Sequence, residues 1–320
     1  MTKPLLIAQD LSKRFAARGL FSRGRPVQAV TGVSMSIARG ETVGLVGESG
    51  SGKSTFGRIA LGLLPPTAGQ VLFDGIDLAR AAPSQRRILR RRMQIVFQDP
   101  HSSLDPRRPI GDQIADGLAI HDLLPRPQRR QRVEDLLAQV GLPPSHADRY
   151  PHQFSGGQRQ RVGIARALAT GPEFLVADEP VSALDVSVQA QVLALMADLR
   201  ARLGLALLFI SHDLAVVRSL CDRVVVMYLG RVMEEGPVAR VFDAPRHPYT
   251  RALLSAVPRL DPSRRRSRIL LPGDPPSPSD PPSGCVFRTR CAIATSECAT
   301  VVPTLRDGVA CIHAGVAAAS

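Results

Sequence analysis

The sequence predicts an α/β fold with a mostly parallel sheet, and two observations carry this prediction. The first is the run GESGSGKST at 47–55, which follows an apolar stretch at 42–46 and precedes a helix-like stretch at 56–64. The second is the alternation of strand-like and helix-like segments along the rest of the chain. Strands that alternate with helices usually form a parallel sheet covered on both faces. The chain has 320 residues, enough for one large α/β domain with an appendage or for two domains.

The run at 47–55 has the composition of a phosphate-binding loop. Its glycines allow a tight turn that points backbone N–H groups inward, and the helix that follows adds partial positive charge. Lys53 would then reach the β- and γ-phosphates of a nucleotide, and the Ser54 hydroxyl would bind Mg²⁺. A flexible glycine and serine turn is the alternative, which the Lys-Ser-Thr end of the run disfavours. The predicted nucleotide-binding residues are Gly47, Glu48, Ser49, Gly50, Ser51, Gly52, Lys53, Ser54 and Thr55.

The remaining elements follow from periodicity and from turn residues. Alternating apolar residues predict strands, which are expected at 4–11, 27–37, 42–46, 70–75, 93–97, 173–177, 206–210 and 223–227. Helical spacing and proline or glycine stops predict helices, which are expected at 56–64, 83–92 and 187–203 and at several places within 106–166. In that last region Val133, Leu136, Leu137 and Val140 share one face and Gly141 is a plausible stop, so a helical insertion is expected.

The chain is strongly basic, with 41 Lys and Arg against 28 Asp and Glu and a net charge of +13. Such a charge is compatible with nucleic acid or with an anionic membrane surface. The arginine clusters at 86–92, 129–132 and 264–266 contain no interleaved aromatic residues, and tryptophan is absent, so base-stacking platforms are not evident. We therefore interpret the clusters mostly as solvated helix faces and expect no nucleic-acid partner. No apolar run approaches the ~18 residues that span a bilayer, and the first residues are too polar for a secretory signal, so we expect a cytosolic chain.

Two acids at the end of a strand-like segment form the second decisive feature. The run FLVADEP at 174–180 would place Asp178 at the carboxyl end of a strand, where it could hold Mg²⁺ beside Ser54. Glu179, the next residue, is a candidate general base for an attacking water. An apolar strand followed by Asp-Glu is common by chance. Its position downstream of a phosphate loop favours the functional interpretation.

The run FSGGQRQR at 154–161 connects these features to a known family. It resembles the LSGGQ signature of the ATP-binding subunits of ABC transporters, with Phe154 where leucine is commoner. Ser155 and two glycines would open a helix and provide a second phosphate-seeking N-terminus. The resemblance covers about residues 4–250. It implies an α/β P-loop NTPase of the ABC type with a mostly parallel core sheet, an antiparallel β subdomain and a helical subdomain. It also implies a head-to-tail dimer, in which each ATP lies between the phosphate loop of one subunit and the signature of the other.

Further motifs match the same family residue by residue. Gln98 resembles the Q-loop glutamine, which approaches Mg²⁺ and water and contacts the membrane partner; the run SALD at 182–185 resembles the D-loop; and His212 resembles the switch histidine. Phe15 resembles the aromatic residue that stacks on adenine, although it could equally be a core residue. The resemblance thus assigns catalytic roles to Glu179, His212 and Gln98, Mg²⁺ ligation to Ser54, Gln98 and Asp178, and further nucleotide contacts to Phe15, Gln98, Asp178, Ser155, Gly156, Gly157, Gln158 and Asp185.

A second resemblance narrows the transported solute. The runs QDPHSSLDPR at 98–107, YPHQ at 150–153 and HPYTRALL at 247–254 look like the oligopeptide/dipeptide importer branch, to which nickel and glutathione importers are close. It implies an ABC ATP-binding domain at 1–250, with its helical subdomain at about 100–166, and a small cysteine-containing C-terminal extension of the oligopeptide/dipeptide-transporter type at 251–320. The implied partners are a second ATP-binding subunit, identical or paralogous, two transmembrane permeases and, indirectly, an extracytoplasmic solute-binding protein. The implied location is the cytoplasmic face of the inner membrane.

A soluble ABC ATPase that acts on nucleic acid or ribosomes is the rival interpretation. The net charge of +13 encourages it. Such proteins usually carry two ATPase cassettes in one chain, whereas this sequence holds one phosphate loop and one signature. The importer interpretation is therefore preferred.

Four of the five cysteines lie in the C-terminal extension, after a proline-rich stretch at 271–284. Cys285, Cys291, Cys298 and Cys311 are separated by 5, 6 and 12 residues. In a cytosolic chain such clustering suggests a metal before a disulfide framework. Zinc sites usually use tighter cysteine pairs, whereas a [4Fe–4S] cluster accepts wider spacing. We favour the cluster, with zinc or unligated thiols as alternatives.

Overall fold

The computed structural model describes residues 3–16, 25–257 and 268–314. The chain divides into two compact units that interleave along the sequence. Unit A contains the described residues of Met1–Leu6, Ser36–Thr42 and Leu72–Ile210, and unit B contains those of Ile7–Met35, Val43–Val71 and Ser211–Ser320. The basic cluster at 264–266 lies outside the described residues. Among the residues that are described, no helix is both long enough and apolar enough to cross a bilayer.

Three parallel strands form the sheet of unit A, in the order β8 (Ala206–Ile210), β7 (Phe174–Asp178) and β6 (Met93–Val96). Every residue of β7 and β8 is buried, as expected for parallel strands that are covered on both faces. Phe174 lies opposite Met93 on one side and Ala206 on the other. Because the strands are parallel and in this register, their carboxyl ends meet at one edge of the sheet.

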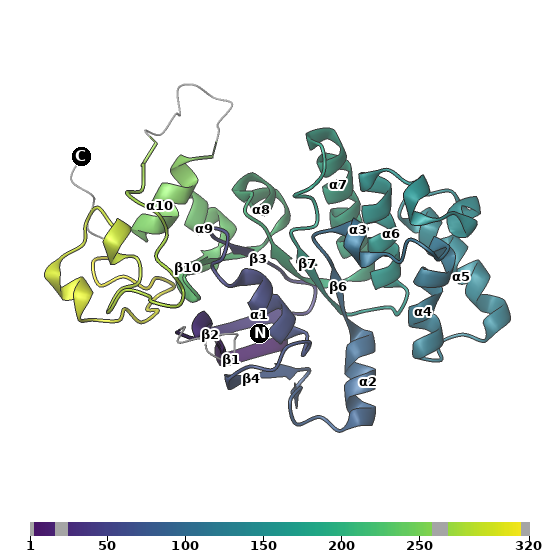
Figure 1. The fold of residues 1–320 in the computed structure, drawn as a ribbon, viewed down its shortest axis with the longest axis horizontal. Helices are drawn as coiled ribbons and strands as arrows, with labels where there is room; N and C mark the ends of the chain where they lie inside the picture. Colours follow the sequence, from purple (N-terminus) through teal and green to yellow (C-terminus); the bar gives the residue numbers. More distant parts are fainter. Residues whose placement is uncertain (1–2, 17–24, 258–267, 315–320) are drawn as a thin grey trace. The chain divides into compact units, whose positions relative to one another are not determined.

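Helices account for most of the remainder of unit A (Figure 1). They are α2 (Pro83–Arg92), α3 (Pro100–Ser103), α4 (Ile110–Ile120), α5 (Arg126–Gln139), α6 (Gly156–Leu168) and α7 (Val186–Leu203), with the 3-10 helices η1 (Pro144–Asp148) and η2 (Pro151–Gln153). Helices α4, α5 and α6 pack against one another. The predicted apolar face of α5 is buried through Val133, Leu136 and Leu137, and Gly141 follows its end with φ of 72°. The structure therefore confirms the helical insertion.

Four charged side chains of unit A form one network around Arg92. Arg92 Nη2 lies 2.7 Å from Asp74 Oδ2 and donates to Glu173 Oε2 at 3.0 Å, while its guanidinium group lies 5.0 Å from the centre of the Phe73 ring. Arg39 also pairs with Asp74, at 2.9 Å, and with Glu173. The hydrogen bond from Arg92 lowers the pKa of Asp74 and that of Glu173. Arg92 is thus half-buried and paired, and the prediction that it belongs to a solvated arginine face is wrong.

Unit B contains the strand that leads into the phosphate loop. Strand β3 (Thr42–Val46), which the sequence predicted, pairs in parallel with β9 (Arg223–Tyr228), and β9 pairs antiparallel with β10 (Arg231–Pro237). Helix α1 (Lys53–Ala60) is shorter than the predicted 56–64, because Gly62 adopts φ of 64° and ends it before the prolines. The other helices of unit B are α8 (Leu214–Leu220), α9 (Val238–Asp243) and α10 (Pro248–Ser255).

A second sheet holds the remaining strands in the order β2 (Val27–Ala38), β1 (Pro4–Phe15), β4 (Ala68–Phe73) and β5 (Ile76–Asp77). Strands β4 and β5 form an antiparallel pair. The turn between them uses Asp74 and Gly75, both with positive φ, as the predicted strand that enters a turn requires. Strands β1 and β2 contain the predicted segments 4–11 and 27–37, and β4 overlaps the predicted 70–75, whereas β5 was not predicted.

The cysteine-containing segment at 268–314 packs within unit B although it has little regular structure, only η4 (Arg288–Arg290) and η5 (Ser296–Ala299). It lies along β10, where Ala310 N donates to Met233 O and Glu235 N donates to Gly308 O, both at 2.8 Å (Figure 1, yellow). Its proline-rich part is tied to β2 by a hydrogen bond from Gln28 N to Pro278 O at 3.0 Å. The stretch at 271–284 is therefore an ordered connection within unit B.

The Arg92 network predicts a pH-dependent loss of stability. Replacing Arg92 by Met should lower the free energy of unfolding by about 1–2 kcal/mol, a value between those of exposed and buried pairs. Because the carboxyl pKa values are lowered by folding, their contribution is present above their unfolded values of about 4 and is lost as the pH falls through the folded values. The difference in Tm between wild type and variant should thus be full at pH 7 and shrink below about pH 4. Arg90→Met, in the same helix but exposed, is the control; an equal loss there would contradict the prediction.

Candidate functional site

Two positions of the phosphate loop in unit B have room for glycine alone. Gly47 has φ of 151°, and a Cβ atom there would lie 2.1 Å from the carbonyl oxygen of Met227. Gly52 is the N-cap of α1 with φ of 98°, and a Cβ atom there would lie 2.0 Å from the carbonyl oxygen of Ala29. Gly230 N donates to Ser51 O at 3.0 Å and fixes the loop from the β9–β10 turn. The loop thus leaves β3 and enters α1 as the sequence predicted.

Lys53 lies folded against this loop. Its side chain is buried, with 5% of the residue exposed, and Nζ donates to the carbonyl oxygens of Gly47 and Glu48 at 2.9 Å each. Ser54 and Thr55 follow in the first turn of α1 and are half-buried. A buried ammonium group at the start of a helix, beside a loop in which Gly47 and Gly52 admit no Cβ atom, fits an anionic ligand such as a nucleotide phosphate.

Glu48 joins the loop to distant parts of unit B. Its backbone N–H donates to the hydroxyl of Tyr249 at 2.9 Å, and its carboxylate accepts from Arg290 Nη1 at 2.8 Å. Tyr249 N in turn donates to Nδ1 of His247 at 3.1 Å. Burial lowers the pKa of His247 to about 3, so its ring is neutral at physiological pH and can accept this bond. Tyr249 and Arg290 were missed by the sequence analysis as residues near the loop, because no local pattern links positions 201 and 242 residues apart from Glu48.

In unit A the register of β6 and β7 brings two predicted residues together. Asp178 ends β7 and is buried, with 5% exposed. Glu179 follows with φ of 47°, and its N–H donates to the carbonyl oxygen of Ile210 at 3.0 Å. Gln98, just beyond β6, donates from Nε2 to Oε2 of Glu179 at 3.0 Å. Positive φ at a non-glycine residue is typical of functional sites, where surrounding structure holds an unfavourable conformation.

The other predicted residues begin or follow regular elements. Ser155 is the N-cap of α6, where Oγ accepts from Gln158 N at 3.4 Å and Gln158 Oε1 accepts from Ser155 N at 3.0 Å, a capping box. Gly156 and Gly157 form the first turn of α6, as expected. Asp185 is the N-cap of α7 and belongs to unit A. His212 comes two residues after the end of β8 in sequence and belongs to unit B. Both residues are exposed.

Phe15 lies at the end of β1 and is 39% exposed. Lys13 Nζ lies 5.3 Å from the centre of its ring. This exposure favours a surface role for Phe15 over the core alternative.

Comparison with known families matches two segments of the chain. Residues 30–182 match the family model described as ABC transporter. Residues 233–298 match the model described as oligopeptide/dipeptide transporter, C-terminal region. The first match contains the phosphate loop, Gln98, the signature and Glu179, and the second contains Cys285, Cys291 and Cys298.

Relatives of similar sequence span nearly the whole chain. A putative peptide import ATP-binding protein of Brucella ovis is 56% identical over 304 residues, which are 95% of this chain and 94% of that protein. The dipeptide transport ATP-binding protein of Escherichia coli is 50% identical over 308 residues, 96% of this chain and 92% of that protein. The chain belongs to the ATP-binding subunits of ABC transporters.

A solved structure agrees with this assignment. The dimeric ATP-binding cassette MJ0796 bound to ADP and phosphate is 30% identical, has a TM-score of 0.65, and covers 73% of this chain and 98% of its own. Family and structure together confirm the predicted fold class, an α/β P-loop NTPase of the ABC type. They also make the chain an ABC-type ATPase.

The four extension cysteines of this ABC-type ATPase are free thiols. Burial raises the pKa of Cys285, of Cys291 and of Cys311. Cys285 N donates to the carbonyl oxygen of Cys298 at 2.8 Å, so the two segments are adjacent. Among the described residues, which include all four cysteines, no three His, Cys, Asp or Glu side chains are arranged to hold a metal ion. The structure therefore does not support the predicted [4Fe–4S] cluster.

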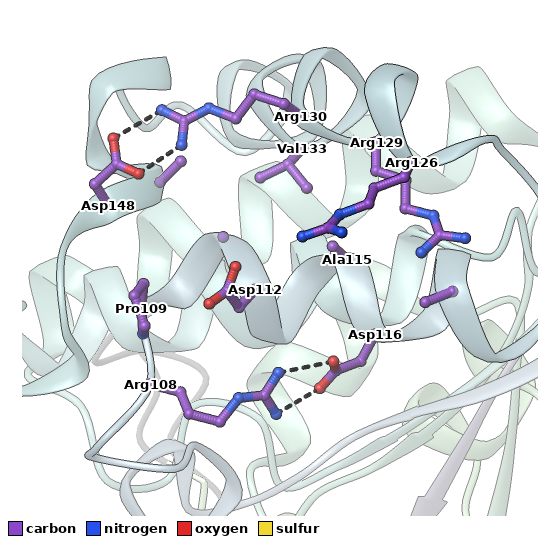
Figure 2. Close-up of a pocket in the computed structure, with 13 residues that line it drawn as sticks. Arg108, Pro109, Asp112, Ala115, Asp116, Arg126, Arg129, Arg130, Val133 and Asp148 are labelled. Atoms are coloured by element: carbon purple, nitrogen blue, oxygen red, sulfur yellow. Dashed lines mark hydrogen bonds and ion pairs between the residues drawn. The ribbon is translucent and has the colours of Figure 1, made fainter.

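A separate cavity of about 450 Å³ lies in unit A between α4, α5 and η1 (Figure 2). Two ion pairs border it: Arg108 Nη2 lies 2.8 Å from Asp116 Oδ1, and Arg130 Nη2 lies 2.8 Å from Asp148 Oδ2. None of the predicted nucleotide-site residues lines this cavity. Within the arginine cluster at 129–132, Arg130 thus joins α5 to η1 through Asp148, so the cluster is not wholly solvated.

The capping box of α6 provides a test of the signature segment. Ser155→Ala should destabilise the start of α6 by about 1 kcal/mol because an N–H group loses its acceptor, whereas Ser155→Thr should retain most of the stability. Thermal unfolding at fixed nucleotide concentration measures the effect. Ser187→Ala, in the first turn of α7, is the matched control, since its hydroxyl has no partner in the part of the chain that is described. Equal Tm values for Ser155→Ala and wild type would refute the capping role.

Proposed function

We propose that the chain is the ATP-binding and ATP-hydrolysing subunit that energises import of dipeptides or oligopeptides, or of a related solute such as nickel or glutathione. The observation that carries this proposal is the presence of both family segments in one chain, at 30–182 and 233–298. It is supported by relatives at 50–56% identity that are named for peptide import and dipeptide transport and that match over more than 90% of both chains.

The nucleotide-binding roles are assigned as follows. Lys53, Thr55 and the backbone N–H groups of the loop at 47–52 bind phosphate oxygens. Phe15 stacks on the adenine. Mg²⁺ would be held by Ser54, Gln98 and Asp178, whose oxygen atoms suit this cation. When bound, it neutralises charge on the phosphates. The glycine-lined loop and the buried ammonium group of Lys53 support this set.

Glu179 is proposed as the general base that takes a proton from the attacking water. The hydrogen bond from Gln98 Nε2 fixes one oxygen of its carboxylate, and the bond from Glu179 N to Ile210 O fixes its backbone. Both restraints reduce the reorganisation that proton transfer requires. His212 is proposed to contact the γ-phosphate.

The partner subunits follow from the same proposal. We propose a dimer of ATP-binding subunits, in which Ser155, Gly156, Gly157, Gln158 and Asp185 of one chain contact the nucleotide held by the other. The dimer would contact two transmembrane permeases through the Gln98 region and transmit its conformational change to them there. An extracytoplasmic solute-binding protein would act indirectly. The proposed location is the cytoplasmic face of the inner membrane, and the proposed domains are 1–250 and 251–320.

The rival function is that of a soluble ATPase that acts on nucleic acid, and it predicts salt-sensitive binding to DNA or RNA. The importer function predicts co-purification with membrane-embedded permeases.

The metal content of the extension stays a prediction of the sequence alone. If Cys285, Cys291, Cys298 and Cys311 bind a [4Fe–4S] cluster, anaerobically purified protein should contain about four irons and four acid-labile sulfides per chain. Zinc without sulfide would favour the second alternative. Absence of iron, sulfide and zinc would leave four thiols without a metal.

Glu179→Gln tests the catalytic assignment. The amide cannot accept the proton, so ATP hydrolysis should fall by about 10²-fold or more while ATP binding persists. The variant should therefore trap ATP and accumulate as the dimer, which gel filtration with bound-nucleotide analysis measures. Asp198→Asn, an exposed carboxylate of α7 paired with Arg202, is the control. Wild-type turnover in Glu179→Gln, or failure of this variant to retain ATP, would contradict the assignment of Glu179 as the general base.

A further inference from the structure

We propose that Arg290 and Tyr249 are positioning residues for the phosphate loop, so that the cysteine-containing extension sets the affinity for ATP through Glu48. The inference rests on the proposed role of the loop in ATP binding. Arg290 lies 242 residues from Glu48 in sequence, beyond the phosphate-loop and signature motifs, and its Nη1 donates to the Glu48 carboxylate. It acts on the nucleotide site through Glu48.

Three polar groups of Glu48 are engaged at once. The backbone N–H donates to Tyr249 Oη at 2.9 Å, the carboxylate accepts from Arg290 Nη1 at 2.8 Å, and the carbonyl oxygen accepts from Lys53 Nζ at 2.9 Å. The first two bonds fix Glu48 from outside the loop. The third passes that constraint to the ammonium group that is proposed to bind phosphate.

Burial makes this connection rigid. Arg290 is 8% exposed and Tyr249 is fully buried, and Arg290 Nε donates to the carbonyl oxygen of Pro272 at 3.3 Å. The ring of Tyr249 packs against Tyr228 and Phe287, with centroids 4.8 and 5.3 Å apart. Because the Arg290 side chain is already fixed by burial, forming the ion pair with Glu48 costs little further rotamer entropy. Exposed ion pairs do not have this advantage and contribute almost nothing to stability.

The anchor lies between two cysteines. Phe287 and Arg290 both belong to the five residues that separate Cys285 from Cys291, in the turn that forms η4. Phe287 also contacts the rings of Tyr228 and His247, at centroid distances of 5.3 and 5.7 Å. A change at either thiol that moves this segment therefore reaches Lys53 through two contacts, Arg290 to Glu48 and Glu48 to Lys53.

The expected kinetic signature is a change in binding rather than in turnover. Lys53 would bind phosphate oxygens in the ground state as well as in the transition state, so a misplaced Lys53 weakens both. The proposed base, Glu179, accepts a hydrogen bond from Gln98, so its placement depends on a different contact. Loss of the anchor should thus raise the Kd and KM for ATP while kcat changes little at saturating ATP.

The experiment uses the full chain and titration with Mg·ATP. Arg290→Met should raise the Kd about tenfold, and Tyr249→Phe, which removes only a hydroxyl and keeps the aromatic cluster, about threefold. Arg290→Lys should recover part of the loss. Arg288→Met is the matched control, because this neighbour in η4 donates to Ser283 and not to the loop. It should leave the Kd within about twofold of wild type.

A double-mutant cycle separates positioning from general destabilisation. Glu48→Gln combined with Arg290→Met should be no worse in Kd than the poorer single variant, because both remove the same pair. Multiplicative losses would overturn the proposal, as would an unchanged Kd accompanied by a lowered Tm, or an equal loss in Arg288→Met. Wild type is measured first: if it neither binds nor hydrolyses ATP, the proposed function fails as well, whereas active wild type with an unaffected Arg290→Met refutes only the positioning role.

Discussion

The buried ammonium group of Lys53 is the constraint on which the organisation of unit B depends. A charge removed from water needs polar partners, and here two carbonyl oxygens, those of Gly47 and Glu48, supply them. Both carbonyls can point inward only because the loop turns back on itself at glycine positions that admit no Cβ atom. Strand β3 leads into this turn, helix α1 follows it, and the β9–β10 turn is bonded to it from Gly230 N to Ser51 O.

Unit A uses a different device, the register of parallel strands. Gln98 and Glu179 are 81 residues apart, and they meet because β6 and β7 run side by side in the same direction and end at the same edge. Glu179 follows the end of β7 with a positive φ, and its carboxylate meets Nε2 of Gln98. The capping box at Ser155 gives α6 a defined first residue. Each unit therefore presents its polar groups at an element end, where backbone N–H groups and carboxyl ends are available.

Most of the fold and the contiguous motifs could be predicted from the local sequence. Strands such as β7 and β8 are short apolar runs, and α2 begins at a proline and ends where the next strand begins, so their patterns are complete within a few residues. The end of α1 was misplaced because Gly62 interrupts the helix before the more conspicuous prolines. The partners of Arg92 could not be foreseen, since Asp74 lies in the β4–β5 turn and Glu173 just before β7, and only the tertiary structure brings them together. The same holds for the cysteines, whose spacing says nothing of where their thiols point.

The contacts of Glu48 bear on how the extension and the ATPase domain relate. The proposed boundary at residue 250 falls directly after Tyr249, yet Tyr249 and Arg290 grip the same loop residue from the two sides of that boundary. A truncated chain that ends at the boundary would keep every nucleotide motif and lose the Arg290 carboxylate pair and the Phe287 ring against Tyr249. Glu48 would then hold a carboxylate without its cation, close to the site proposed for phosphate, where an added negative charge opposes anion binding. In electrostatic terms the proposal therefore makes the extension part of the phosphate site rather than an appendage to it.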